Sequence, residues 1–185
     1  EKRQYKNNYR DKDERSPFDG ARIPPQDLDS ERALLGAIII SPESFYDIED
    51  IITHDTFYAE KHKSIWKAVV DLKNRKEPVD LISLHAHLKK IDDIDRIGGP
   101  AYLAELSNAV GSAANIKYYA THLRKKELLR KLIEVSTRIA DKSFAEKDDV
   151  ELILEEAEKE VFDITSAGSG AGKLVHLGEL IDEAW

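Results

Sequence analysis

The 185-residue sequence contains no cysteine. The absence of thiols excludes disulfides and thiolate chemistry, and it is compatible with a cytosolic setting. The sequence also lacks any run of about 18 apolar residues, the length that a helix needs to cross a bilayer. Its first residues are polar and charged, without the apolar core of a signal peptide. We therefore expect a cytoplasmic protein without a membrane span.

Sustained alternation of apolar and polar residues, the pattern of a half-buried strand, is missing too. Charged and apolar residues make up 35% and 41% of the sequence, as in a soluble globular protein. We predict an all-α fold in which a globular helical head precedes a long antiparallel helical hairpin. The predicted divisions are a mobile polar tail at 1–21, the head at 22–112, the hairpin at 113–165, a flexible linker at 166–173 and the start of a further helix at 174–185. Because the sequence stops inside this last helix, we expect a longer parent protein.

Several local sequence signals indicate where the helices of the head begin and end. Apolar periodicity predicts helices over 27–40, 42–52, 60–73, 81–91 and 101–109. Asp27 or Asp29 is placed to cap the first of these helices. Gly36 inside it costs about 1 kcal/mol relative to alanine, which indicates a close contact with another helix. Ser41-Pro42 is a cap followed by proline, a combination that starts the second helix.

The first arm of the hairpin, residues 116–142, has two neighbouring apolar rows. One row contains Leu128, Leu132, Val135 and Ile139, and the other contains Leu129, Ile133, Ser136 and Ala140. The second arm, residues 149–164, carries a single stripe made of Val150, Ile153, Ala157, Val161 and Ile164. Because one narrow stripe cannot cover two rows, the first arm should keep apolar surface for another body.

Charge also distinguishes the two arms, since basic residues predominate in the first and acidic residues in the second. This pattern favours antiparallel pairing, although each exposed ion pair contributes only about 0–1 kcal/mol. An ordinary helix pair within one chain would show the same charge pattern. Of these two interpretations, we favour a hairpin that assembles subunits. The net charge of −8 should repel nucleic acid. The patch Lys125-Lys126 with Arg130-Lys131 could contact phosphate, but the acidic arm competes for these side chains.

One segment, Gly168 to Lys173, superficially resembles a phosphate-binding loop. The P-loop pattern requires glycine where this chain has Ala167, and it requires a serine or threonine Mg²⁺ ligand where this chain has Leu174. An enzyme that hydrolyses nucleotides at this segment would turn over ATP, and we expect no turnover.

The histidines and clustered aspartates do not predict a catalytic or metal site. His85 and His87 are two apart on a predicted helix, so their side chains point in different directions. His62 lies on an apolar helix face, which is typical of a hydrogen-bonded core histidine. Asp92-Asp93 with Asp95 could bind a cation weakly, but a solvated turn is the simpler interpretation. We therefore predict no catalytic, cofactor-binding or metal-binding residue in this chain.

Several short blocks follow one another along the chain. They are Arg22-Ile23-Pro24-Pro25, Ser30-Glu31-Arg32-Ala33-Leu34-Leu35-Gly36, Phe57-Tyr58, His62 with Ile65, Pro78-Val79-Asp80, Gly98-Gly99 with Tyr102-Leu103, and Ala113-Ala114-Asn115 with Tyr118-Tyr119-Ala120. In this order they resemble the amino-terminal domain of bacterial replicative DNA helicases of the DnaB family. The resemblance covers residues 23–164, and residues 174–185 match the family's linker helix more loosely.

The resemblance implies a helical head and a hairpin that pairs between subunits, so that three dimers form a collar on a hexameric ring. It also implies docking of a DnaG-type primase and, in some species, of a helicase loader. ATP and Mg²⁺ would be used by a RecA-like motor domain expected after Trp185, so no ATPase residue is carried over to this chain. Such a protein would work in the bacterial cytoplasm, associated with the nucleoid.

The sequence and the resemblance together predict interface residues and no catalytic ones. The predicted contacts between hairpins or with partners are Leu128, Leu132, Ile133, Val135 and Ile139, and Tyr102 is the head's predicted share of a docking surface. The residues predicted to dock the linker helix are Leu177, Leu180, Ile181 and Trp185. An alternative is a free-standing helical adaptor or loader without a motor, and the residues after Trp185 would distinguish the two.

Overall fold

A computed structural model describes residues 23–168 of the chain. Within these residues the structure is helical and contains no strand, which confirms the predicted all-α class. The elements are α1 (Leu28–Ile40), the 3-10 helices η1 (Pro42–Asp47) and η2 (His54–Thr56), α2 (Glu60–Asn74), α3 (Leu81–Lys90), α4 (Ile94–Ile97), α5 (Gly99–Asn108), α6 (Ile116–Ala145) and α7 (Val150–Gly168). The residues predicted for linker-helix docking, Leu177, Leu180, Ile181 and Trp185, lie outside the described residues.

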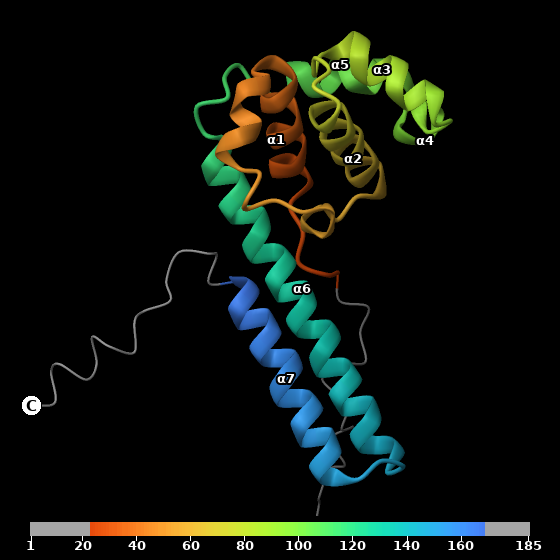
Figure 1. Cartoon of the computed structure of the whole chain (residues 1–185), viewed down its shortest axis with the longest axis vertical. Helices are drawn as coiled ribbons and strands as arrows, with labels where there is room; N and C mark the ends of the chain where they lie inside the picture. The colour runs from red at the N-terminus through yellow and green to blue at the C-terminus, as the bar shows by residue number, and fades with distance from the viewer. Residues whose placement is uncertain (1–22, 169–185) are drawn as a thin grey trace, which may run out of the picture.

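The molecule has two parts, which we call the head (α1 to α5 with η1 and η2) and the hairpin (α6 and α7) (Figure 1). Helix α6 starts beside the head and continues far beyond it, and α7 returns antiparallel along its outer half (Figure 1). With 30 residues, α6 is about 45 Å long. The predicted antiparallel hairpin is thereby confirmed.

The head encloses the hydrophobic core. The ring of Trp66 packs on Phe45 and Phe57, with centroid separations of 5.5 Å and 5.6 Å. The first turns of α6 add Ile116 and Leu123 to the same core, each 3% exposed or less. The base of the hairpin is therefore fixed to the head by apolar packing.

Two local predictions for α1 are confirmed. Asp27 is the N-cap, and its carboxylate accepts hydrogen bonds from the Ser30 amide at 3.0 Å and the Ser30 hydroxyl at 2.8 Å. A Cβ added to Gly36 would lie 2.2 Å from the carbonyl oxygen of Leu106 on α5. Only glycine at position 36 permits α1 and α5 to lie this close together.

Two predicted boundaries in the head are wrong. The segment after Ser41 forms a short 3-10 helix instead of an α-helix to residue 52, because its amides bond three residues back, as Ile48 does to Phe45. The α-helix α4 falls in a region expected to be a loop. Its single turn is too short to show periodicity in the sequence, and Gly98 ends it in the left-handed region at φ +106°.

The second arm of the hairpin is longer than predicted. Helix α7 continues to Gly168, so residues 166–168, predicted to be flexible linker, are helical. The rest of the predicted linker, residues 169–173, lies outside the described residues. Between the arms Glu146 adopts the left-handed conformation (φ 48°) that ends α6.

Candidate protein interface

The seam between α6 and α7 uses Val135 and Ile139 of the first predicted apolar row. Val135 is 7% exposed, and Ile139 is half-buried beside Ile153 and Ala157 of α7. Leu128 is half-buried as well. Val135 and Ile139, two of the predicted interface residues, therefore contribute mainly to the fold of the hairpin itself.

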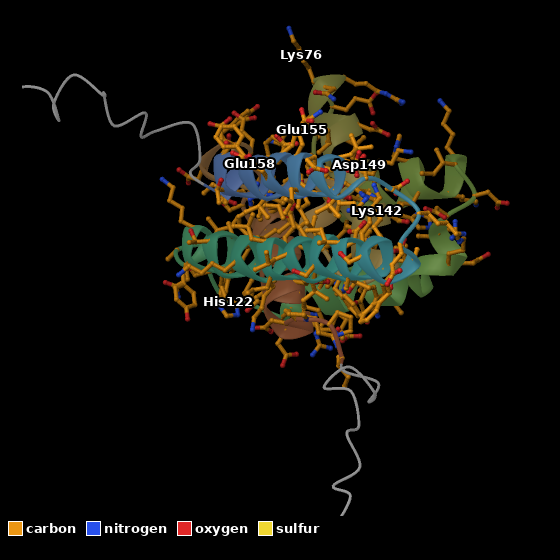
Figure 2. The ribbon with its side chains drawn as sticks, turned by 90° about the horizontal axis from the view of Figure 1, so that it is seen from below. Lys76, His122, Lys142, Asp149, Glu155 and Glu158 are labelled. Carbon is orange, nitrogen blue, oxygen red and sulfur yellow. The ribbon has the colours of Figure 1, made fainter. Side chains whose placement is uncertain are left out.

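Ion pairs close one edge of this seam. Lys142 binds Glu156, and the Arg138 guanidinium lies 3.4 Å from the Glu160 carboxylate. The hydrogen bond to Glu156 raises the pKa of the Lys142 amine. In Figure 2 Lys142 lies between the two helices, whereas Glu155 and Glu158 point away from α6. Opposite charges thus meet across the antiparallel arms, as the sequence predicted.

The uncovered row of α6 combines Leu132 from the first predicted row with Leu129 and Ile133 from the second. Leu129, Leu132 and Ile133 are 48%, 43% and 53% exposed, which confirms that the first arm keeps apolar surface. This surface lies about a quarter turn around α6 from the seam, on the side away from the ion-paired edge. It faces solvent in a single copy of the chain.

The predicted single stripe of α7 is in fact divided. Its half-buried residues, such as Ile153, face α6, but Val150, Leu154 and Val161 are 65%, 63% and 41% exposed. Their spacing of four and seven residues puts these three on one side of α7. Because the helices are antiparallel, this side adjoins the uncovered row of α6 at the edge opposite the ion pairs. We name the combined surface the hairpin apolar face, and its residues are Leu129, Leu132, Ile133, Val150, Leu154 and Val161.

A groove of about 610 Å³ opens where this face approaches the head. Its lining residues are Ile23, Pro24, Arg130, Leu132, Ile133, Glu134, Ser136 and Thr137. One wall is the extended chain before α1, where Ile23 is 75% exposed, and the other wall is α6. Apolar side chains from segments 100 residues apart therefore meet in one groove.

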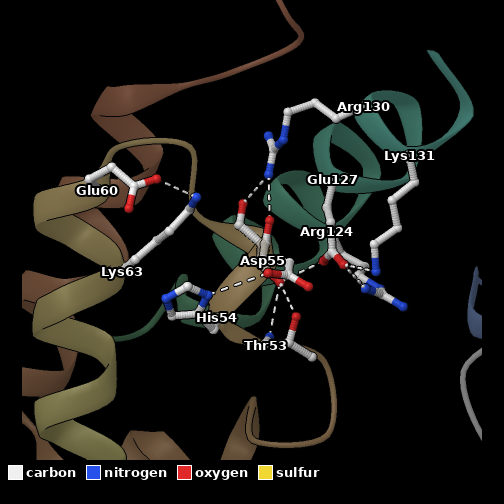
Figure 3. A network of polar contacts seen from close by, with 10 residues as sticks. Thr53, His54, Asp55, Glu60, Lys63, Arg124, Glu127, Arg130 and Lys131 are labelled. Atoms are coloured by element: carbon white, nitrogen blue, oxygen red, sulfur yellow. Dashed lines mark hydrogen bonds and ion pairs between the residues drawn. The ribbon is translucent and has the colours of Figure 1, made fainter. Parts of the chain in front are cut away.

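Arg130 holds these two walls together, and Figure 3 shows it beside Asp55 of η2. Its guanidinium donates hydrogen bonds to the carbonyl oxygens of Pro25 at 2.9 Å, Asp55 at 2.7 Å and Thr56 at 2.8 Å. These bonds connect α6 with the chain before α1 and with η2. The sequence predicted that the acidic arm would compete for Arg130. This prediction is wrong, because Arg130 lies next to the head and donates its hydrogen bonds to carbonyl oxygens there.

Glu127, one turn before Arg130, is the second polar contact of this junction (Figure 3). Its carboxylate is 1% exposed, accepts a hydrogen bond from the Thr56 hydroxyl at 2.7 Å, and pairs with Arg124 at 2.6 Å and Lys131 at 2.8 Å. Lys131 is therefore also engaged within α6. This carboxylate was not among the residues predicted from the sequence, although an acid three and four residues from basic partners on a helix was a usable signal.

The burial of Glu127 would raise its pKa, but the bonds from Arg124, Lys131 and Thr56 outweigh burial and lower it. A lowered pKa in the folded state means that the ionised carboxylate stabilises the fold above its ordinary pKa of 4.5. This stabilisation is lost as the pH falls through the folded-state pKa.

We expect urea unfolding of the wild type to show a steeper loss of stability below pH 4.5 than unfolding of Glu127→Gln. Parallel pH curves for the two proteins would contradict the role given to Glu127.

The chain is similar to known proteins. The family described as "DnaB-like helicase N terminal domain" matches residues 23–125. The chain belongs to the DnaB-like helicase family. It is 37% identical over 153 residues to the replicative DNA helicase DnaB of Geobacillus stearothermophilus, covering 82% of this chain and 34% of that protein. It is 40% identical over 162 residues to the replicative DNA helicase DnaB of Haemophilus influenzae, covering 85% and 35%. The DnaB-like chain thus spans about a third of the length of these relatives.

Solved structures agree with the fold of the DnaB-like chain. The N-terminal domain of DnaB helicase from Mycobacterium tuberculosis superposes with a TM-score of 0.73 at 36% identity, covering 76% of this chain and 99% of that one. A DnaB-like replicative helicase, from a structure that describes its interactions with primase, superposes with a TM-score of 0.63 at 23% identity. That match covers 85% of this chain and 34% of the other, and it supports the fold alone.

Tyr102, predicted as a docking residue in the head of this DnaB-like chain, is 8% exposed. Its hydroxyl lies 2.6 Å from Nε2 of His62, and Nδ1 of His62 lies 2.5 Å from the Glu31 carboxylate. Lys61 covers the outer face of the Tyr102 ring at 3.7 Å. The prediction of a hydrogen-bonded core histidine is confirmed. The burial of Glu31 could not be predicted from the sequence, because an acid in the first turn of a helix is usual and gives no sign of burial.

Within the part of the chain that the structure describes, the remaining candidate histidines and aspartates do not come together in one site. Over residues 23–168 no group of three or more potential metal-ligating side chains is present. His87 is buried within 3.3 Å of Asp71 on α2, whereas His85 lies beside a shallow hollow between α3 and α5. None of the described helices is long and apolar enough for a membrane span. Of the predicted interface residues, Leu132 and Ile133 are the two that meet in the groove.

Proposed function

We propose that this chain assembles the subunits of a hexameric replicative DNA helicase during DNA replication, as the amino-terminal collar of the ring. The hairpin apolar face carries the proposal, because it exposes leucine, isoleucine and valine side chains from both arms. Full burial of each such side chain contributes about 1.5–3 kcal/mol. Pairing of hairpins would bury this face, and three such dimers would complete the collar.

The proposal leaves unwinding to the rest of the protein. ATP and Mg²⁺ would be used by a RecA-like motor domain, and DNA would pass through the ring of the parent helicase without direct contact with this domain. The net charge of −8 supports a collar that binds proteins rather than DNA. We place the parent helicase in the bacterial cytoplasm, at the nucleoid.

A DnaG-type primase is the proposed partner of the assembled collar, with a helicase loader as a second one. The support comes from a relative of similar fold whose structure was described together with its interactions with primase. Tyr102 is 8% exposed and covered by Lys61, so the head would contribute the surface around Lys61 rather than the Tyr102 ring itself. Light scattering of this chain with an added primase carboxy-terminal domain tests this part of the proposal.

Leu132→Glu should convert the self-associated chain to monomer. The substitution puts a charge at the centre of the hairpin apolar face, where burial without a partner is costly. We expect the dissociation constant for self-association to rise at least about 100-fold, since one buried charge costs several kcal/mol. Light scattering over a concentration series measures the change.

Ile82→Glu is the matched control, because Ile82 is an apolar residue 81% exposed on α3 of the head. This variant should associate like the wild type. A wild-type chain that stays monomeric at all concentrations, or a Leu132→Glu chain of unchanged mass, would refute assembly through the hairpin apolar face.

A further inference from the structure

The groove between α6 and the chain before α1 exposes apolar side chains on both of its walls. Ile23 is 75% exposed, and Leu132 and Ile133 are 43% and 53% exposed, so the described residues leave them open to solvent. The groove volume of about 610 Å³ lies within the range of pockets that hold a ligand. Concave apolar surface of this kind marks a binding site. The groove is therefore a candidate docking site for an apolar side chain.

The chain itself leads into this groove. Ile23 and Pro24 line one wall, so the residues before them start at its rim. The Arg130 guanidinium donates a hydrogen bond to the carbonyl oxygen of Pro25 at 2.9 Å and thereby holds this point of the chain against α6. A segment tethered so close to a site is present there at an effective concentration on the order of millimolar. The residues before Ile23 therefore reach the groove ahead of any separate partner.

Phe18 is the residue of this segment that suits an apolar groove. It is the only large apolar residue within 10–22. Phe18 is five residues before Ile23, a distance of at most about 18 Å along the chain. The groove extends along α6 from Arg130 to Thr137, which is about 10 Å. The tether is thus long enough for Phe18 to enter any part of the groove.

We propose that residues 15–22 fold back along α6 and that Phe18 fills the groove. Full burial of a phenylalanine side chain contributes about 1.5–3 kcal/mol, and Leu132 and Ile133 are withdrawn from water with it. Ordering the backbone of each residue costs about 1–2 kcal/mol. Because the gain and the cost are of similar size, the covered and uncovered forms of one chain interconvert.

Charge favours an orientation in which the segment runs from Ile23 away from the head. Glu134 lines the groove, and its side chain is 73% exposed and lies 3.8 Å from Arg138, near the limit of an ion pair. Arg15 is three residues before Phe18, which puts its guanidinium within reach of the Glu134 carboxylate. An exposed pair contributes about 0–1 kcal/mol, so it sets the register of the segment more than its stability.

The covered form competes with self-assembly. Leu132 and Ile133 belong both to the groove and to the hairpin apolar face, so a chain whose groove holds Phe18 cannot bury them against another subunit. This consequence rests on the proposed function, whereas the docking of Phe18 does not. Each pairing requires two uncovered chains. Covering half of the chains would therefore raise the apparent dissociation constant about fourfold.

The first test measures how close the segment lies to α6 within one chain. Asp19→Cys and Thr137→Cys are combined in the full chain, which otherwise contains no cysteine, and the rate of intramolecular disulfide formation is measured in dilute solution. The matched variant carries the same two substitutions together with Phe18→Ala, so the tether is unchanged and only the ring is removed. We expect disulfide formation in the matched variant to be at least about threefold slower.

The second test measures self-association by light scattering over a concentration series. Phe18→Ala should lower the dissociation constant at least about fourfold, because the groove is no longer covered. Tyr9→Ala is the matched control, since it removes an aromatic ring fourteen residues before Ile23 and leaves Phe18 in place. This control should associate like the wild type. Both variants should keep the wild-type circular dichroism spectrum, because the hydrophobic core of the head contains neither residue.

The outcomes separate this inference from the proposed function. Equal rates of disulfide formation with and without Phe18 would overturn its docking and leave assembly through the hairpin apolar face intact. A slower rate with an unchanged dissociation constant would overturn the competition. A chain that stays monomeric at all concentrations would refute the proposed function and the competition, while the disulfide rates would still decide the docking. A slower rate together with tighter association would establish both steps.

Discussion

Replacing Glu31 by alanine will lower the free energy of unfolding by about 3–5 kcal/mol. The carboxylate is fully buried and accepts hydrogen bonds from the amides of Tyr58 at 2.6 Å and Ala59 at 3.3 Å. It also lies 2.5 Å from the ring of His62. Alanine would leave these donors buried without an acceptor, which costs far more than the loss of one exposed hydrogen bond. Urea unfolding followed by circular dichroism measures the change.

Two further variants define the source of this effect. Tyr102→Phe removes only the hydroxyl at the far end of the network and should cost about 1 kcal/mol. Glu49→Ala removes an exposed carboxylate and should change stability by less than about 0.5 kcal/mol. If Glu31→Ala were no more destabilising than Glu49→Ala, the network would not be holding α1 to α2.

Gly36→Ala will destabilise the head by about 2–3 kcal/mol. The added methyl carbon would lie 2.2 Å from the carbonyl oxygen of Leu106, so α1 and α5 must separate. The helix-forming preference of alanine would by itself add about 1 kcal/mol of stability, and this gain is too small to offset the clash. The midpoint of chemical denaturation, compared with that of the wild type, measures the difference.

Gly111→Ala is the matched control for Gly36→Ala. A Cβ at Gly111 meets no atom within 4 Å, and Gly111 does not have a positive φ. Alanine should therefore be neutral or stabilise the protein by up to about 1 kcal/mol through the unfolded state. Equal midpoints for the two variants would show that α1 and α5 can move apart without cost.

Features set by neighbouring residues could be predicted from the sequence. Asp27 caps α1 through atoms three residues away, and Gly36 stands out because glycine is unfavourable inside a helix. The uncovered row of α6 followed from counting apolar residues on the two arms. Each of these inferences needs only helical periodicity and local propensity.

Features set by contacts between distant segments could not be predicted. Thr56 and Glu127 are 71 residues apart, and no pattern within either segment indicates that they meet. The division of the α7 stripe depends on how α7 is rotated about its own axis, which is decided by its contacts with α6. For the same reason the groove could not be predicted, although two of its lining residues, Leu132 and Ile133, were predicted interface residues.

The continuous helix α6 has a mechanical consequence. The head holds α6 as far as Arg130, so about 22 Å of the rod is unsupported by the head, and a tilt of about 10° would move its far end by about 4 Å relative to Arg130. The contacts that set this tilt include the buried Ile116 and Leu123, the hydrogen bond between Thr56 and Glu127, and the bonds of Arg130. Ångström-scale adjustments in these contacts would thus be transmitted along the rod to its remote tip.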